Sequence, residues 1–217
     1  MSSEFGYIPE SPEQSFGNNK GIFTPTDIYN LDRDDKWTQY GQLELIETQT
    51  VSGVSAVNFT SIEETKYNVH YLTYNNITPT ATGFGYHNVR LSNDGGSSYE
   101  SSNYDYANFY IGVNAGDTSD GLRSTTASEI GDIFAISGTT STIGVSGYMY
   151  FYQLGDSTKY SFTNHLNMGD NFNASSYMYY GFGAYHQNET MNAIQWFSDS
   201  SVTFNGDFSL YGVREYS

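Results

Sequence analysis

Apolar and polar residues alternate along most of the chain, from residue 42 onward. In the first run Leu43 and Leu45 share one face, and the polar residues share the other. Because successive side chains of a β-strand point to opposite faces, this period of two predicts strands. Similar short runs follow at 57–59, 67–73, 89–91, 109–111, 133–136, 148–154, 159–162, 178–182, 193–197, 202–204 and 208–213.

Turn-forming residues separate these runs. Gly, Asp, Asn and Ser cluster between them, as at 92–96, and such residues favour tight turns. About ten short strands with at most one helix predict an all-β fold in which two antiparallel sheets pack face to face. Among sandwiches and barrels we expect a jelly-roll-like topology. No linker interrupts residues 41–217, so these residues form the predicted β-sandwich domain.

The first forty residues follow a different pattern. Pro9, Pro12 and Pro25 are three of the four prolines in the chain, and glycines and asparagines stand between them. Pro and Gly disfavour long helices and central strands, whereas a disordered tail rarely carries many aromatic residues. We therefore expect residues 1–40 to form an extended arm that lies on another surface. The predicted partner-binding residues of this arm are Phe5, Tyr7, Ile8, Phe16, Phe23, Ile28 and Tyr29.

One short helix is expected near the end of the arm. Thr24 is a suitable N-cap residue, Pro25 fits the first helical position, and Asp27 interacts favourably with the positive end of the helix dipole. These signals predict a helix over residues 28–34.

Charge narrows the range of partners. The chain has 217 residues and a formal net charge of −16, and its eight Lys and Arg residues form no cluster that could neutralise several phosphates. A surface this acidic repels nucleic acid and anionic headgroups over roughly 8 Å at physiological salt. The start of the chain has neither the basic residues nor the apolar run of a secretory signal, and no segment has the roughly 20 apolar residues of a membrane helix. We expect neither a nucleic-acid nor a membrane partner.

Residues that could carry chemistry are few and dispersed. The chain has no Cys, and its four His residues stand at no metal-ligand spacing. Each His is expected to be a strand residue with hydrogen-bonded ring nitrogens. The stretch 114–121 is a candidate calcium loop, but it lacks the denser Asp pattern and the bidentate Glu of such loops, so an Asp-Gly turn is favoured. We expect no catalytic residue, no metal site and no cofactor.

Aromatic residues dominate the apolar content, with 21 Tyr and 14 Phe. Exposed Tyr and Trp can anchor a protein partner or stack on a sugar ring, because they offer a large area with few rotatable bonds. Alternatively, they fill the core or pair across strands. Because 21 tyrosines are too many to fit in one core, we expect some of them to lie at an interface between subunits. The favoured assembly is a homotrimer. The candidate interface or glycan-platform residues are Trp37, Tyr148, Tyr150, Tyr152, Tyr179 and Trp196.

Several segments along the chain also carry a family resemblance. They are FGYIPESP (5–12), QSFGNN (14–19), GIFTP (21–25), DIY (27–29), GQLELIETQTV (41–51), YFYQL (150–154), DSTKY (156–160) and SLYGVREY (209–216). In these segments the chain resembles virion proteins of tailed phages that infect marine bacteria, including cyanobacteria. The resemblance implies a protein that is made in the host cytoplasm, assembles in many copies and resides on the virion surface. It implies no catalytic or binding residue.

Together these features predict a non-enzymatic virion structural protein on the particle exterior, which decorates or cements the capsid through its arm. Its expected partners are the major capsid protein or other virion proteins, and further copies of itself. The alternative is a head or tail fibre protein that binds a host surface glycan through exposed Tyr and Trp. A third interpretation, a carbohydrate-active enzyme, requires two opposed carboxylates in a cleft.

Overall fold

The computed structural model describes residues 14–15, 18–19, 24–34, 42–80, 83–113, 118–137, 144–171, 175–199 and 202–215. Contacts divide the chain into two compact units, Met1–Gln42 and Leu43–Ser217. The boundary predicted from the sequence lies between residues 40 and 41.

The first unit contains a short hairpin and one helix among its described residues. β1 (Gln14–Ser15) pairs antiparallel with β2 (Asn18–Asn19), and α1 spans Pro25–Arg33. The short helix predicted from the sequence is confirmed. It begins at Pro25, three residues before the expected start.

The start of α1 is fixed by Thr24 and Asp27. The Asp27 amide donates to Thr24 Oγ1 over 3.2 Å, and the Thr24 amide donates to an Asp27 carboxylate oxygen over 2.8 Å. Each side chain therefore satisfies a backbone donor near the helix start. Hydrogen bonds from the Thr24 hydroxyl and amide lower the pKa of the Asp27 carboxyl.

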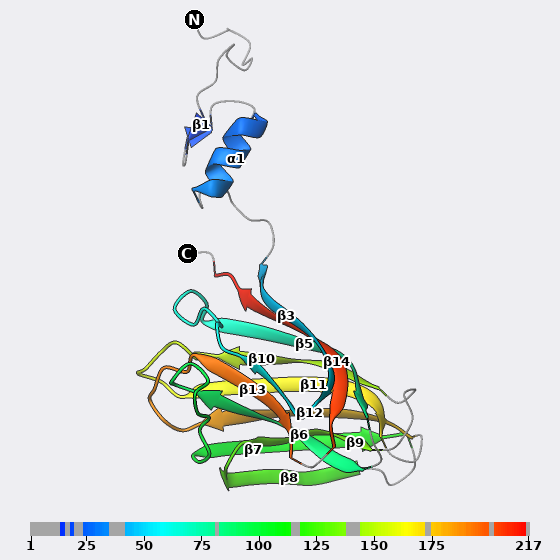
Figure 1. Ribbon diagram of the computed structural model, residues 1–217. Coiled ribbons are helices and arrows are strands. Elements are labelled where there is room, and N and C mark those ends of the chain that lie inside the picture. Colours follow the sequence, from blue (N-terminus) through cyan, green and yellow to red (C-terminus); the bar gives the residue numbers. More distant parts are fainter. Residues whose placement is uncertain are drawn as a thin grey trace, which may run out of the picture. The chain divides into compact units, whose positions relative to one another are not determined.

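The second unit is a sandwich of two antiparallel sheets (Figure 1). In the order of pairing, the larger sheet contains β3 (Leu43–Val54), β14 (Phe204–Val213), β5 (Val69–Pro79), β10 (Val145–Tyr152), β11 (Ser161–Asn171), β12 (Ser175–Tyr185), β7 (Tyr104–Gly112) and β8 (Thr118–Ala127). The smaller sheet contains β4 (Ala56–Phe59), β13 (Ala193–Ser198), β6 (Phe84–Ser92) and β9 (Ile130–Ser137). The predicted all-β sandwich is confirmed.

The chain crosses repeatedly between the two sheets. It runs from β3 to β4, β5 and β6, changing sheet each time, and it crosses again from β9 to β10 and from β13 to β14. Two hairpins, β7–β8 and β11–β12, intervene and extend the larger sheet beyond β10. As a result, β10 and β11 are the two middle strands of the larger sheet.

The core between the sheets is built on aromatic contacts. Trp196 of β13 is fully buried, and its ring centroid lies 4.5 Å from that of Tyr74 on β5. Phe134 of β9 and Phe208 of β14 lie 5.7 and 5.8 Å from the same indole. Complete burial of such a side chain contributes about 1.5–3 kcal/mol. This cluster therefore joins four strands from both sheets.

The turn predicted at 92–96 is present. Gly95 and Gly96 adopt φ values of +73° and +83°, which glycine accepts at little cost. An Asp94 carboxylate oxygen accepts a hydrogen bond from the Ser98 amide over 2.9 Å. Hydrogen bonds from the Ser98 hydroxyl and amide, followed by one from Ser92, lower the pKa of Asp94 to about 2.

Candidate functional site

Three residues of the predicted platform, Tyr148, Tyr150 and Tyr152, share the outward face of β10. They alternate with Met149 and Phe151, which are buried in the core. The three tyrosines are only half-buried, and the ring centroids of Tyr150 and Tyr152 lie 6.1 Å apart. β10 therefore presents a row of phenolic rings on the outside of the sandwich.

Tyr71 of β5 and Tyr211 of β14 continue this row across the larger sheet. The Tyr71 ring centroid lies 4.6 Å from that of Tyr150, 5.7 Å from that of Tyr148 and 6.2 Å from that of Tyr211. Burial and the neighbouring tyrosines raise the pKa of the Tyr71 hydroxyl. The ring is therefore neutral at physiological pH. Tyr71 and Tyr211 are not among the platform residues predicted from the sequence, because their place in the row with Tyr150 depends on the register between strands far apart in the chain.

The platform prediction is wrong for Tyr179 and Trp196. Trp196 is fully buried in the core, where its indole N–H donates to His87 Nδ1 over 2.7 Å. Tyr179 is 5% exposed and lies on the inward face of β12, with its ring 5.3 Å from that of Tyr110. Both side chains fill space between the sheets, so neither can contact a partner. Trp37 lies outside the described residues.

Most of the predicted arm residues also lie outside the described part of the chain. They are Phe5, Tyr7, Ile8, Phe16 and Phe23. Ile28 and Tyr29 lie on α1, and both side chains are exposed. A helical turn with two adjacent exposed apolar side chains remains available for a contact.

Exposed apolar side chains extend the tyrosine row toward β7. Phe182 of β12 and Met168 of β11 are each 57% exposed. Isolated exposed apolar residues are common, whereas a contiguous patch marks an interaction site. We call this surface the aromatic face, and it consists of Tyr71, Tyr148, Tyr150, Tyr152, Tyr211, Phe162, Leu166, Met168, Met178, Tyr180, Phe182, Phe109 and Ile111.

Two shallow depressions lie along the aromatic face. One, of about 390 Å³, is lined by Asp105, Arg123 and Phe182 among others, where the small side chain of Ala107 leaves room. The other, of about 570 Å³, is lined mainly by apolar atoms, including those of Met168 and Ile111. The first therefore combines an aromatic ring with charged groups, and the second is apolar.

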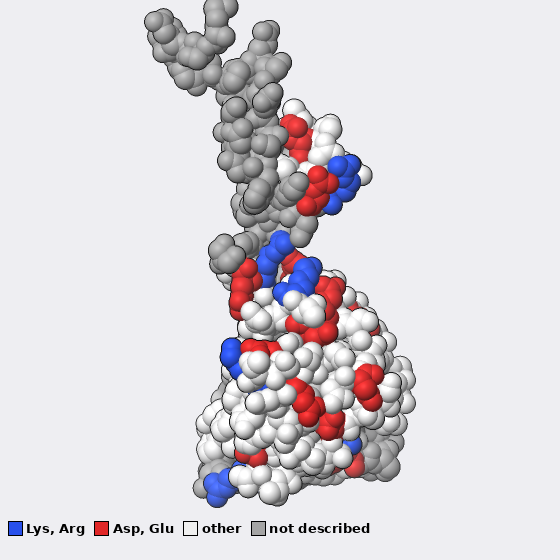
Figure 2. Space-filling model, turned by 90° about the vertical axis from the view of Figure 1, so that its left-hand side faces the viewer, with Lys and Arg blue, Asp and Glu red and all other residues white. Residues whose placement is uncertain are grey.

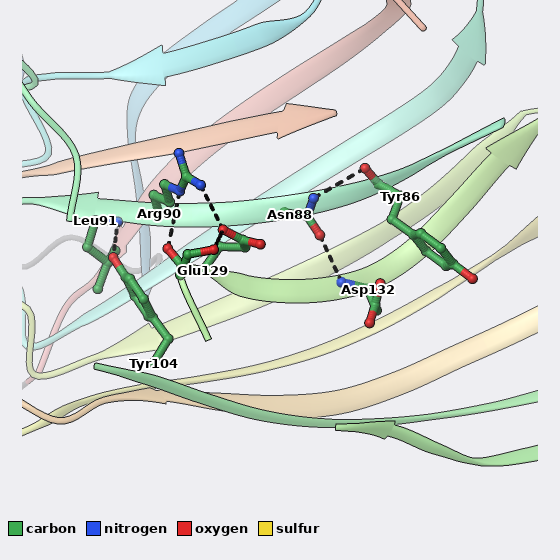
Figure 3. Close-up of polar contacts among 8 residues, drawn as sticks. Tyr86, Asn88, Arg90, Leu91, Tyr104, Glu129 and Asp132 are labelled. Carbon is green, nitrogen blue, oxygen red and sulfur yellow. Dashed lines mark hydrogen bonds and ion pairs between the residues drawn. The ribbon is translucent and has the colours of Figure 1, made fainter. Parts of the chain in front are cut away.

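Polar side chains join the two sheets near β6 (Figure 3). Arg90 donates to a Glu129 carboxylate oxygen over 2.7 Å and to the Ser128 carbonyl over 3.2 Å. The Leu91 amide of β6 donates to the hydroxyl of Tyr104, a residue of the larger sheet, over 2.8 Å. These groups are inaccessible or partly buried, so their contacts hold the sandwich together.

Asparagine side chains hold β9, an edge strand of the smaller sheet. Asn108 Nδ2 donates to the carbonyls of Gly131 and Asp132 over 2.7 and 2.9 Å, and Asn167 Nδ2 donates to that of Ile133 over 3.2 Å. Asn88 Oδ1 accepts from the Asp132 amide over 2.8 Å (Figure 3). Buried backbone groups without partners are costly. Asn108 and Asn167 of the larger sheet therefore supply donors to carbonyls of this edge strand, and Asn88 of β6 accepts at the irregularity of the β6–β9 pairing.

Asp132 of β9 combines a left-handed backbone conformation with a partly buried carboxyl group. Its backbone adopts φ +56° within an irregularity of the β6–β9 pairing, and the Tyr106 hydroxyl donates to Asp132 Oδ2 over 2.7 Å. Burial raises the pKa of Asp132, and the charges of Asp199 and Glu129 raise it further, against the effect of the Tyr106 bond. Its neighbours fix the backbone of β9, which indicates a structural role.

The histidines differ in their partners. His70 Nε2 contacts the Ile62 carbonyl at 2.7 Å, and His87 Nδ1 accepts from Trp196. His165 lies on the inward face of β11, and neither of its ring nitrogens has a hydrogen-bond partner among the described residues. The expectation that each His is a strand residue with hydrogen-bonded ring nitrogens is therefore wrong for His165. It holds for only one ring nitrogen of His70 and of His87, because His70 Nδ1 and His87 Nε2 also have no hydrogen-bond partner among the described residues. His186 follows the last residue of β12 and is not in a strand. Burial lowers the pKa of His87 and of His165 to about 3.

Charged residues gather beside β3 and the end of β14. The Tyr67 hydroxyl donates to a Glu44 carboxylate oxygen over 2.5 Å, and Lys66 Nζ and Arg214 Nη1 lie 3.0 and 3.1 Å from Glu44 oxygens. Hydrogen bonds from Tyr67 and then Lys66 lower the pKa of Glu44. Elsewhere Asp and Glu are dispersed, as Figure 2 shows for one side of the sandwich. Lys66 Nζ also lies 3.4 Å from a Glu63 carboxylate oxygen, so the two basic residues of this cluster are paired with two carboxylates.

The described residues contain neither a metal-binding cluster nor a membrane-spanning helix. Within the described ranges, no group of three or more His, Asp or Glu side chains is placed to hold a metal ion. Asn114–Asp117 of the candidate calcium loop lies outside those ranges. In the part of the chain that the structure describes, no helix has the length and hydropathy needed to cross a bilayer.

Comparisons with protein families, with curated proteins and with solved structures gave no match to this chain.

Proposed function

We propose that the chain is a non-enzymatic structural protein of a tailed-phage virion, located on the particle exterior, where it decorates or cements the capsid. The aromatic face carries this proposal. An uncharged aromatic surface on a protein with a net charge of −16 suits assembly with other protein chains, because interface cores are depleted of charge and enriched in aromatic residues. The segments that resemble phage virion proteins, such as 41–51 and 209–216, support the biological setting.

The strand order supports a jelly-roll topology, which we include in the proposal. Without the hairpins β7–β8 and β11–β12, eight strands remain, in the orders β3-β14-β5-β10 and β4-β13-β6-β9. Numbered along the chain, these orders are 1-8-3-6 and 2-7-4-5, as expected for two interlocked Greek keys in a jelly roll. Viral capsid domains and lectins both use this topology. The fold alone therefore does not choose between assembly and glycan binding.

The attachment device in this proposal is the N-terminal arm. Its proline-punctuated sequence favours an extended path along a partner, and its apolar residues would order on contact. Exposed Ile28 and Tyr29 on α1 would belong to the same contact.

Locating the chain in an electron-microscopy map of the whole particle tests the proposal directly. We expect density for the sandwich on the outer surface of the capsid, and its absence from the particle would overturn the proposal. Deletion of residues 1–36 tests the arm separately. Particles assembled with this variant should lose most of the protein, whereas normal occupancy would remove the docking role.

The alternative, glycan recognition by a fibre protein, is favoured by the depression beside β7. Phe182 offers an exposed ring, and Asp105 and Arg123 provide acceptors and donors for sugar hydroxyls. A glycan array would test it, with Phe182→Ala as the disabling variant and Phe84→Ala as a control on the smaller sheet. Binding that is lost only in Phe182→Ala would favour this function over decoration.

A further inference from the structure

The hydrophobic pattern of β11 is inverted with respect to the sandwich. Its inward-facing residues are polar and buried, namely Ser161, Thr163, His165 and Asn167. Its outward-facing residues include Phe162, Leu166 and Met168, of which Phe162 and Met168 are exposed. Antiparallel strands with one solvated face normally direct apolar residues inward and polar residues outward. An outward apolar set on a central strand indicates that its outer side is also covered.

The same outward set continues in register on the neighbouring strands. Tyr148 of β10 is the partner of Leu166, which in turn is the partner of Tyr180 on β12, and Tyr180 is the partner of Phe109 on β7. A second row runs from Met168 through Met178 to Ile111. The strand register therefore places these apolar side chains next to one another, and they form a continuous surface across four strands.

The described side chains in the middle of this surface are uncharged. On β5, β10, β11 and β12, the outward side chains that the structure describes are all uncharged. Asp105 and Arg123 lie toward the β8 edge, and Asp207 lies on β14. Two copies with a net charge of −16 each repel one another over most of their surfaces. The aromatic face is where they can approach without bringing carboxylates together.

The size of the surface fits a protein partner. Eight strands spaced about 4.8 Å apart, each at least eight residues long at about 3.3 Å per residue, give the larger sheet a projected area of roughly 900 Å². A stable interface buries about 800 Å² on each partner. A second sheet of equal size would cover the aromatic face, whereas a short oligosaccharide would cover only a fraction of it.

We propose that the aromatic face binds the aromatic face of a second copy of this chain, so that two larger sheets pack against each other around a two-fold axis. The same surface on both partners makes an isologous contact, which closes as a dimer rather than as a trimer. Because β10 and β11 are the middle strands, the axis passes near the register pair Tyr150 and Asn164. The inference deepens the proposed function by naming the partner of its assembly surface, and it rests on that proposal only for the biological setting.

The test uses two phenylalanines with the same exposure on opposite sheets. Phe162 on the aromatic face and Phe84 on β6 are both 43% exposed, so Phe162→Glu and Phe84→Glu place the same new charge in comparable environments. The mass of the full-length protein is measured by sedimentation between about 1 and 100 μM, a range that reports a micromolar Kd. The wild type and Phe84→Glu should form dimers, and Phe162→Glu should associate at least about tenfold more weakly. Circular dichroism checks that all three are folded.

Chemical cross-linking tests the same contact without a substitution that weakens association. The chain has no Cys, so Asn164→Cys introduces a unique thiol near the expected axis, and Phe84→Cys introduces one on the other sheet. A short bismaleimide should join Asn164→Cys into covalent dimers and leave Phe84→Cys monomeric. A monomeric wild type, a trimer, or equal responses of the paired variants would overturn the proposal. A dimer in solution that never appears on particles would retain this inference and refute the proposed function instead.

Discussion

Tyr71 of β5 and Tyr150 of β10 are register partners whose ring centroids lie 4.6 Å apart, with their planes inclined by 36°. The pair stands on the outward face of the larger sheet, where a solvated sheet normally carries polar side chains. Each ring also contacts a further tyrosine, Tyr211 for Tyr71 and Tyr152 for Tyr150. The same rings thus contact one another across the sheet and belong to the surface that we propose binds a second copy of the chain.

We expect this pair to show a measurable coupling energy. Cross-strand aromatic pairs contribute about 0.5–1.5 kcal/mol beyond the area that they bury. A double-mutant cycle with Tyr71→Ala, Tyr150→Ala and the double variant, followed by urea unfolding at one fixed protein concentration, should give a coupling of about 1 kcal/mol. Additivity within about 0.3 kcal/mol would show that the rings are stabilised only through their other neighbours.

The Asn108 side chain on the β7–β8 hairpin should contribute strongly to the free energy of unfolding. Asn108→Ala leaves the carbonyls of Gly131 and Asp132 without their donor, and each buried unsatisfied group costs about 1–3 kcal/mol. We expect the free energy of unfolding to fall by about 3 kcal/mol. Asn68→Ala removes an exposed bond to Glu215 of 2.9 Å and should change the same quantity by less than about 0.5 kcal/mol. Similar losses in the two variants would contradict the role of Asn108 at β9.

The sequence was informative about periodicity and turns. The period of two at Leu43 and Leu45 predicts a strand, and residues of this kind do lie in β3. Yet both leucines are exposed. The sequence does not predict this, because alternation shows which residues share a face but not whether that face is inward. β11 has the same ambiguity, since its polar set is the buried one. Which face of a strand is directed into the core depends on the sheet that contains it, and sheet membership depends on pairings between strands far apart in the chain.

The candidate site could be predicted only where a single strand carries it. Tyr148, Tyr150 and Tyr152 alternate within β10, so their common face follows from the sequence. Trp196 was misplaced because aromatic content alone does not distinguish a core residue from a surface anchor. The asparagines at β9 were missed for a related reason. Their partners are backbone carbonyls of a strand more than twenty residues away, which no local pattern specifies.

Close packing should make Gly181 intolerant of any side chain. A Cβ atom there would lie 2.0 Å from Asn108 Oδ1 and 2.6 Å from the Ala107 carbonyl oxygen. The backbone contact cannot be relieved by a rotamer change, so Gly181→Ala should lower the free energy of unfolding by about 3 kcal/mol. Gly53→Ala is the comparison, because Gly53 has φ +68° and no atom within 4 Å of that point. Its cost should be about 1–2 kcal/mol, from backbone strain alone. Denaturant unfolding that ranks the two variants in the opposite order would contradict this explanation.

The buried histidines should make the fold sensitive to mild acid. Burial depresses the pKa of His87 and of His165 from 6.5 to about 3, so the unfolded chain binds protons between these values that the folded chain does not. Stability is therefore fully present above pH 6.5 and falls as the pH is lowered toward 3, by about 1.4 kcal/mol per pH unit for each histidine. Urea unfolding of His165→Leu should show a slope against pH that is smaller by this amount. Thr163→Val, a non-titrating change on the same inward face of β11, should keep the wild-type slope. If His165→Leu has the same slope as the wild type, the folded and unfolded chains protonate the His165 imidazole alike, and burial does not depress its pKa.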